Sequence, residues 1–150
     1  QLTLVTECRV ADRIIDADVA RLTQVVQNLL SNAIKFSPEG GKIRVEIDAG
    51  QLPAGRRAAD HGIREARAIR FIDSGVGIPA DEVESIFDKF VQSSLTKTGA
   101  GGTGLGLAIS RGIVRQHRGT IVAKNNAEGG ACITVTLPTT LKTAVRGKND

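Results

Sequence analysis

The chain has 150 residues, of which 41% are hydrophobic, and a formal net charge of +4. This is the size of one domain with one core, and the core must be mainly aliphatic, because the sequence has four Phe and no Trp or Tyr. No apolar run is long enough to span a bilayer and the sequence has no signal peptide, so we expect a soluble, cytoplasmic domain without direct membrane contact.

The mild positive charge does not predict a nucleic-acid surface. Arginines gather between residues 56 and 70, but no aromatic side chain interleaves with them apart from Phe71 at the edge. We therefore interpret this segment as a solvated loop and expect no nucleic-acid partner. Cys8 and Cys132 lie in alternating apolar stretches without C-x-x-C spacing, which predicts two buried free thiols rather than a disulfide or a metal site.

The first elements predicted are two strands and a long helix. Residues 2–10 alternate apolar and polar side chains, as a strand does, and residues 13–16 predict a second, short strand. The helix that follows can be capped by Asp16 or Asp18, and it ends before Pro38, since the residue before proline is pushed out of the α region. One arc of this helix must face a core: Val19, Leu22, Val25, Val26, Leu29 and Ala33.

The rest of the chain alternates strands with further helices. The segments predicted are a strand (42–49), a long loop (50–65), a strand (68–73), a short helix capped by Asp81 (81–88), a polar and mobile lid (90–102), a helix (103–118) and a hairpin of two strands (119–124 and 131–137). The inner side of the second long helix is predicted to carry Leu105, Ala108, Ile109, Ile113 and Val114.

This order of elements predicts an α+β fold. We expect a two-layer α/β sandwich with one mixed, mostly antiparallel sheet and about three helices on one of its faces. Residues 1–138 are predicted to form one domain, and residues 139–150 a polar tail or linker.

A polar stripe runs along the long helix beside its apolar arc. Gln24, Asn28, Asn32 and Lys35 follow at i, i+4, i+8 and i+11, and no acid is among them. A carboxamide oxygen is a neutral ligand suited to Mg²⁺, and an ammonium one turn further on suits a phosphate. The helix alone leaves two interpretations open: a site for magnesium and phosphate, or two incidental asparagines on a wet face.

A first glycine-rich turn follows a predicted strand. Asp73 closes the strand, and Gly75 and Gly77 let the backbone pass close to a bound group. An acid in this place can accept a hydrogen bond from an exocyclic amine, such as N6 of adenine, although a lone acid at a strand end is usually a turn former.

A second glycine-rich loop leads into the helix predicted at residues 103–118. Backbone N–H groups at such a helix start favour an anion. Gly99, Gly101 and Gly104 formally satisfy G-x-G-x-x-G, but a polar loop and not a strand precedes them, so the dinucleotide motif does not fit. A P-loop is also excluded, because Leu105 stands where that motif requires Lys.

Together and in this order, the motifs resemble the ATP-binding catalytic domain of sensor histidine kinases. This family belongs to the superfamily of gyrase, chaperone, histidine kinase and mismatch-repair ATPases, with the Bergerat fold. Residues 28–36 are similar to its asparagine box, 73–77 to its first glycine box, 87–90 to its phenylalanine box and 102–106 to its second glycine box. The resemblance covers roughly residues 4–138.

The resemblance implies a site for ATP and Mg²⁺. Asn28 and Asn32 are expected to hold Mg²⁺, with Asn32 the more critical, and Lys35 to reach the phosphates. Asp73 is expected to recognise the adenine amine. The other nucleotide contacts that the resemblance implies are Phe36, Gly75, Gly77, Ile78, Phe90, Lys97, Gly102, Thr103, Gly104, Leu105 and Gly106.

The activity implied is transfer of the γ-phosphoryl group to a histidine on a separate dimerisation domain, with a response regulator downstream. Hydrolysing members of the superfamily resemble one another in a Glu where this chain has Asn28, and an amide cannot take a proton from water. Neither His61 nor His117 looks like the phosphoacceptor.

Two alternatives remain. One is a hydrolytic ATPase or a serine kinase of the anti-sigma type, against which Asn28 argues. The other is a degenerate nucleotide sensor or scaffold, against which the complete motifs argue. By the same resemblance, a longer protein containing the chain is expected to be cytoplasmic or anchored in the inner membrane.

Overall fold

The computed structural model describes residues 1–54, 62–95 and 102–140. In chain order, the elements of this part are β1 (Thr3–Cys8), α1 (Val19–Phe36), β2 (Lys42–Pro53), β3 (Ile63–Ile72), a 3-10 helix (Ser85–Phe87), α2 (Gly106–Gln116), β4 (Thr120–Asn125) and β5 (Ala131–Pro138). No helix in it is long and apolar enough to cross a membrane.

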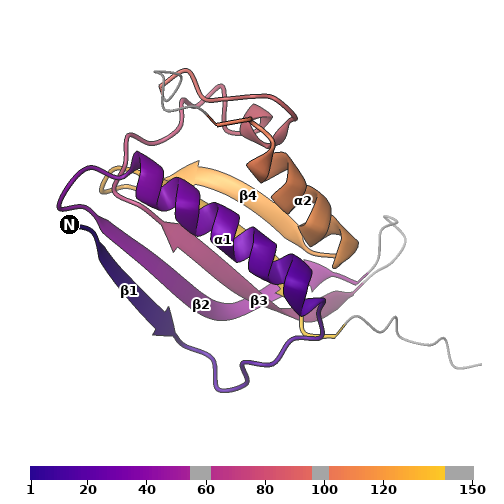
Figure 1. Ribbon diagram of the computed structural model, residues 1–150. Helices are drawn as coiled ribbons and strands as arrows, with labels where there is room; N and C mark the ends of the chain where they lie inside the picture. The colour runs from indigo at the N-terminus through magenta and orange to yellow at the C-terminus, as the bar shows by residue number, and fades with distance from the viewer. Residues whose placement is uncertain (55–61, 96–101, 141–150) are drawn as a thin grey trace, which may run out of the picture.

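The strands of the described residues form one sheet with the order β1-β2-β3-β5-β4. The pair β1 and β2 is parallel, and the other pairs are antiparallel. Both α-helices cover the same face of this sheet (Figure 1). The predicted α+β sandwich is therefore confirmed, although this part of the chain has two α-helices and one short 3-10 helix where about three helices were expected.

Helix α1 begins and ends at the residues that the sequence indicates. The Asp18 side chain accepts a hydrogen bond from the Arg21 N–H at 3.0 Å, so Asp18 and not Asp16 is the N-cap. Ser37 is already extended, with φ −79° and ψ 141°, because Pro38 follows it.

The buried arc of α1 is narrower than predicted. Val25, Leu29 and Ala33 are buried, whereas Val19 is 78% and Val26 38% exposed. At about 100° per residue, Val19 and Val26 lie at one edge of the arc that Val25, Leu29 and Ala33 define, so the predicted burial was wrong for them.

Two predicted boundaries before β3 are wrong. Residues 13–16 form no strand; instead, the buried Arg67 donates from Nε to the Asp12 carbonyl at 2.9 Å and holds this connection. The long loop predicted at residues 50–65 has strands at both of its ends, because β2 continues to Pro53 and pairs with β3 from Ile63; residues 55–61 lie outside the described residues. Backbone pairing across the hairpin stabilises strands there without an alternating pattern of side chains.

Two predicted helices are shorter than expected. The helix predicted at residues 81–88 is only the 3-10 turn, in which Ile86 and Phe87 are buried, so Phe87 belongs to the core. Helix α2 begins at Gly106, because Gly104 has a φ of +68° that no α-helix accommodates. Its buried residues are Ser110, Ile113 and Val114, whereas Ile109, which was expected inside, is 43% exposed.

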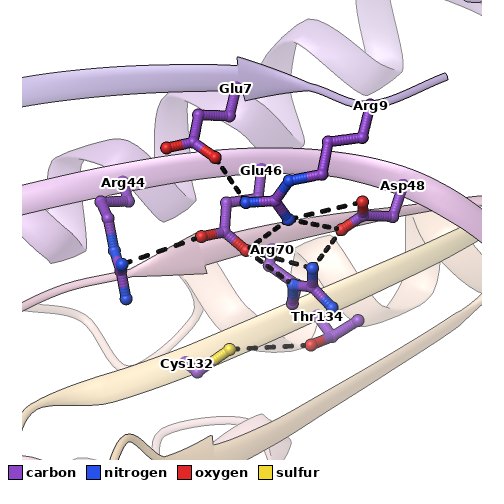
Figure 2. A network of polar contacts seen from close by, with 8 residues as sticks. All are labelled: Glu7, Arg9, Arg44, Glu46, Asp48, Arg70, Cys132 and Thr134. Carbon is purple, nitrogen blue, oxygen red and sulfur yellow. Dashed lines mark hydrogen bonds and ion pairs between the residues drawn. The ribbon is translucent and has the colours of Figure 1, made fainter. Parts of the chain in front are cut away.

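The face of the sheet opposite the helices carries a network of charged side chains (Figure 2). Its members are Glu7, Arg9, Arg44, Glu46, Asp48 and Arg70. Glu46, only 7% exposed, lies 3.1 Å from Arg70 Nη2 and 3.6 Å from Arg9 Nη1. The hydrogen bond to Glu7 and the charge of Asp48 raise the pKa of the Arg9 guanidinium. Strands β1, β2 and β3 are thus connected through side chains as well as through the backbone.

His117 connects the end of α2 to the start of α1. Its ring is buried, Nε2 accepts a hydrogen bond from the Asp18 N–H at 3.0 Å, and Nδ1 lies 2.8 Å from the Ile113 carbonyl. Because Nε2 is the acceptor, the proton of the neutral ring belongs on Nδ1, which donates to Ile113. The histidine therefore has a structural role that the sequence did not indicate.

Replacement of His117 by Ala is expected to lower the free energy of unfolding by about 1–3 kcal/mol. The change leaves the Asp18 N–H without its acceptor and removes a buried ring. Urea denaturation measures this loss, and replacement of the exposed neighbour Gln116 by Ala is the control. Equal stability of the two variants would contradict the role given to His117.

Candidate functional site

A cavity of about 480 Å³ lies between α1, the segment after β3 and the start of α2. Most of the residues predicted to bind nucleotide or metal line it: Asn28, Asn32, Lys35, Phe36, Asp73, Gly77, Ile78, Gly102, Thr103, Gly104 and Gly106. These residues come from three separate stretches of sequence, within residues 28–36, 73–78 and 102–106. The fold therefore brings the predicted motifs to one place.

Of the other four predicted site residues, three are described and do not line the cavity. Gly75 lies next to the cavity wall, where an added Cβ would come within 2.6 Å of the Phe36 carbonyl oxygen. Leu105 precedes α2 as its N-cap. Phe90 is 75% exposed, with a φ of +65°, and its N–H donates to the Gly104 carbonyl at 2.9 Å. Lys97 lies outside the described residues.

The two asparagines of α1 line the cavity. Asn28 donates from Nδ2 to the Ser110 hydroxyl at 2.9 Å, and no donor in the described chain reaches its Oδ1. Within the same residues, the Asn32 carboxamide has no hydrogen-bond partner, and it is half-buried. Both carboxamides are thus available as ligands from one side of the cavity.

Gly106 makes room for Asn28. A Cβ on Gly106 would come within 2.3 Å of Asn28 Oδ1 and 2.9 Å of its Nδ2. Any side chain at position 106 would therefore displace the carboxamide, so the glycine is needed for close contact between the two helices and not for a special backbone angle.

One end of the cavity is electropositive. The Lys35 ammonium lies 3.5 Å from the position that a Cβ on Gly102 would take, and 5.2 Å from the Phe36 ring centre. Helix α2 has no side-chain cap at its start, so its first N–H groups remain available to an anion. A cation and a helix start together favour a phosphate group here.

The Asp73 carboxylate is fixed by backbone donors on one side only. Its Oδ1 accepts from the Gly75 N–H at 2.8 Å and from the Ala131 N–H at 3.0 Å. Its Oδ2 accepts nothing from the described residues, and Asp73 lines the cavity. This carboxylate can therefore accept one further hydrogen bond from a bound group.

Asn125 holds the backbone beside Asp73 in place, and the sequence did not indicate this. Its Oδ1 accepts from the Ile78 N–H at 2.8 Å, and its Nδ2 donates to the Ile78 carbonyl at 2.7 Å. Gly77 has a φ of +77°, and a Cβ there would come within 2.9 Å of Asn125 Oδ1. The turn therefore requires glycine at position 77.

A profile of the family described as "Histidine kinase-, DNA gyrase B-, and HSP90-like ATPase" matches residues 17–141. The chain belongs to this ATPase family. The match includes every residue that lines the cavity.

Sensor histidine kinases are among the relatives of this ATPase domain. It is 39% identical over 128 residues to the sensor histidine kinase WalK of Bacillus subtilis, and the match covers 85% of the chain but 19% of WalK. The chain thus spans about a fifth of the length of this relative.

Solved structures of histidine kinases are also similar to the chain. The catalytic domain of histidine kinase ThkA, in a nucleotide-free form, is 29% identical with a TM-score of 0.73, covering 93% of this chain and 80% of that one. A complex of ThkA with the response regulator protein TrrA matches at 27% identity and a TM-score of 0.70, covering 93% and 35% of the two chains. The chain is therefore an ATP-binding catalytic domain of the histidine kinase type.

The walls of the cavity in this ATPase domain include residues that sequence reasoning missed. They are mostly apolar: Leu29, Ala33, Phe71, Val76, Ile86, Val91, Leu107, Ala131 and Ile133, together with Ser31, Gln92 and Ser93. Alternation identified the strands that carry Phe71, Ala131 and Ile133. Only the pairing of β3 with β5 decides which side chains of these strands face the cavity.

The donor set of the ATPase domain fits a magnesium ion that is held partly by nucleotide. In the described chain, no group of three or more His, Cys, Asp or Glu side chains could hold a metal. The available atoms are the carboxamide oxygens of Asn28 and Asn32, and Mg²⁺ commonly takes few protein ligands beside substrate phosphates and water.

Proposed function

We propose that the chain is the Mg·ATP-binding catalytic domain of a sensor histidine kinase and donates the γ-phosphoryl group to a histidine on a separate dimerisation domain. One observation carries the proposal. A single cavity combines the free acceptor of Asp73, the carboxamides of α1, and the positive end formed by Lys35 and the start of α2. These match the base, the metal and the phosphates of Mg·ATP.

Each part of the cavity has a role in this proposal. Asp73 Oδ2 accepts the adenine amine, while Gly77 and Ile78 form a floor that Asn125 holds in place. The apolar walls exclude water from the base. Asn28 and Asn32 hold Mg²⁺, which when bound offsets phosphate charge, and Lys35 contacts the phosphates. The N–H groups at the start of α2 complete the anion site.

The site supports transfer to a protein acceptor better than hydrolysis. Asn28 occupies the place from which a carboxylate could activate water, and its amide nitrogen is already bonded to Ser110. Phosphoryl transfer needs mainly positioning and charge stabilisation, so the domain can supply the donor half while an acceptor domain supplies the histidine.

The names of the similar proteins support a two-component partner set. WalK is named a sensor histidine kinase, and ThkA is found in complex with a response regulator. We propose a dimerisation and phosphotransfer domain and a downstream response regulator as the partners of this chain, with a cytoplasmic site of action. We propose no nucleic-acid partner.

Replacement of Asn32 by Ala is expected to weaken binding of Mg·ATP about 100-fold, because a metal ligand contributes several kcal/mol and about 1.4 kcal/mol is tenfold in affinity. The helix should be unaffected, since Ala is the best helix former. Titration calorimetry with an ATP analogue and Mg²⁺ measures the affinity, and thermal unfolding reports the fold.

Gln24 offers a matched control for Asn32. It belongs to the same polar stripe, is exposed and does not line the cavity, so Gln24→Ala should bind Mg·ATP as the wild type does. Equal affinity of the wild type and Asn32→Ala would remove Asn32 from the metal site. A wild-type chain that binds no nucleotide would favour a degenerate sensor or scaffold.

A further inference from the structure

Ser110 is a buried polar residue in the interior of α2. Its side chain is 1% exposed, and it follows Gly106 by one helical turn. Serine forms helices less readily than alanine, and a buried hydroxyl requires a hydrogen-bond partner. That partner is Asn28, whose Nδ2 donates to the Ser110 oxygen at 2.9 Å.

The hydrogen bond to Ser110 distinguishes the nitrogen of the Asn28 carboxamide from its oxygen. The nitrogen donates to Ser110, whereas Oδ1 lies beside Gly106, another residue of the cavity lining, and accepts no hydrogen bond from the described residues. A carboxamide rotated by half a turn would present its NH₂ group to the cavity, and an NH₂ group cannot bind a cation. When Oδ1 binds a metal, only the nitrogen can contact Ser110, and the hydroxyl must then accept.

We propose that Ser110 is a positioning residue for the magnesium site and keeps Asn28 Oδ1 turned toward the metal of bound Mg·ATP. This inference rests on the proposed function. Partners that orient a ligand in this way typically change metal affinity about 10- to 100-fold when they are removed. The alternative is that the hydrogen bond between Asn28 and Ser110 only stabilises the packing of α1 against α2.

The two interpretations predict different metal dependence. Loss of a positioning contact raises the Mg²⁺ concentration needed for tight nucleotide binding and leaves metal-free binding unchanged. Loss of a helix contact lowers thermal stability and weakens nucleotide binding equally with and without Mg²⁺.

The experiment compares Ser110→Ala, Ser110→Cys and Ser110→Thr with the wild type. Calorimetric titrations of a non-hydrolysable ATP analogue, at a series of Mg²⁺ concentrations and without Mg²⁺, give the half-saturating Mg²⁺ concentration. We expect it to rise about tenfold in the Ala and Cys variants. Thr keeps the hydroxyl and should restore the wild-type value.

Ile113 provides a stability control on the same helix. It is buried but does not line the cavity, so Ile113→Val should lower the thermal midpoint and leave the Mg²⁺ dependence unchanged. If Ser110→Ala fails to fold, Ser110→Cys retains the volume of the side chain with a weak acceptor and decides the question.

An unchanged Mg²⁺ requirement in a folded Ala or Cys variant overturns the inference and leaves the proposed function intact. Equal losses of affinity with and without Mg²⁺ also overturn it. Failure of the wild-type chain to bind Mg·ATP is a separate result, which overturns the proposed function itself.

Discussion

Replacement of Asp73 by Asn is expected to abolish the preference of the domain for ATP over GTP. In the wild type, Oδ1 is held by the N–H groups of Gly75 and Ala131, so the other carboxylate oxygen is the one offered to the base. An asparagine keeps its oxygen on those two donors and turns its NH₂ group toward the base. That group then faces the adenine amine, which is also a donor.

The expected loss of ATP affinity follows from the loss of one hydrogen bond, between the Asp73 carboxylate and the adenine amine. A hydrogen bond to a charged group contributes about 1.5–3 kcal/mol, so ATP binding should weaken about 10- to 100-fold. Guanine presents an acceptor at O6, which can pair with the new NH₂ group, so GTP binding should weaken less or improve. Competition titrations with the two nucleotides measure the ratio.

Two further variants at acidic positions make this test specific. Asp73→Ala also removes the acceptor of Gly75 and Ala131, so it should lower the thermal midpoint more than Asp73→Asn does. Asp81→Asn changes an exposed acid outside the cavity and should leave both affinities unchanged. If the Asn variant retains the wild-type preference for ATP, Asp73 does not recognise the base.

Local signals in the sequence were sufficient to predict elements whose ends are marked by a capping residue, a proline or a turn. Asp18 and Pro38 mark the ends of α1, and the hairpin of β4 and β5 has the predicted strands. These features depend on backbone chemistry within a few residues. The ends of α1 and the hairpin of β4 and β5 therefore did not require knowledge of the tertiary structure.

Long-range pairing accounts for what the sequence did not predict. The strands on either side of residues 55–61 are stabilised by each other, although neither has a clear alternating pattern near its end. His117 has a buried role because its partner, Asp18, lies 99 residues earlier in the chain. The same holds for Ser110 with Asn28 and for Asn125 with Ile78. The sequence motifs predicted many of the residues that line the cavity, but not the residues that hold them in place.

The isolated chain is expected to bind Mg·ATP without phosphorylating itself. His117 is 6% exposed, and both of its ring nitrogens are bonded to backbone groups, so neither can attack a phosphate. It follows Gly106 by eleven residues along α2, which places it roughly 16 Å from the start of the helix at about 1.5 Å per residue. His61 lies outside the described residues, and it is followed by Gly62, whereas a phosphoacceptor histidine of the family is expected to be followed by an acid.

Hydrolysis is also expected to be slow, because Asn28 cannot accept a proton from water. Incubation with γ-labelled ATP should therefore leave the chain unlabelled and release phosphate only at the background rate. Addition of a dimerising helical domain that carries an acceptor histidine should produce acid-labile label on that domain alone, since in-line positioning of the acceptor is what the chain lacks. Acid-labile label on His61 or His117 of the isolated chain would contradict this division of the reaction, and rapid phosphate release would favour a hydrolytic ATPase.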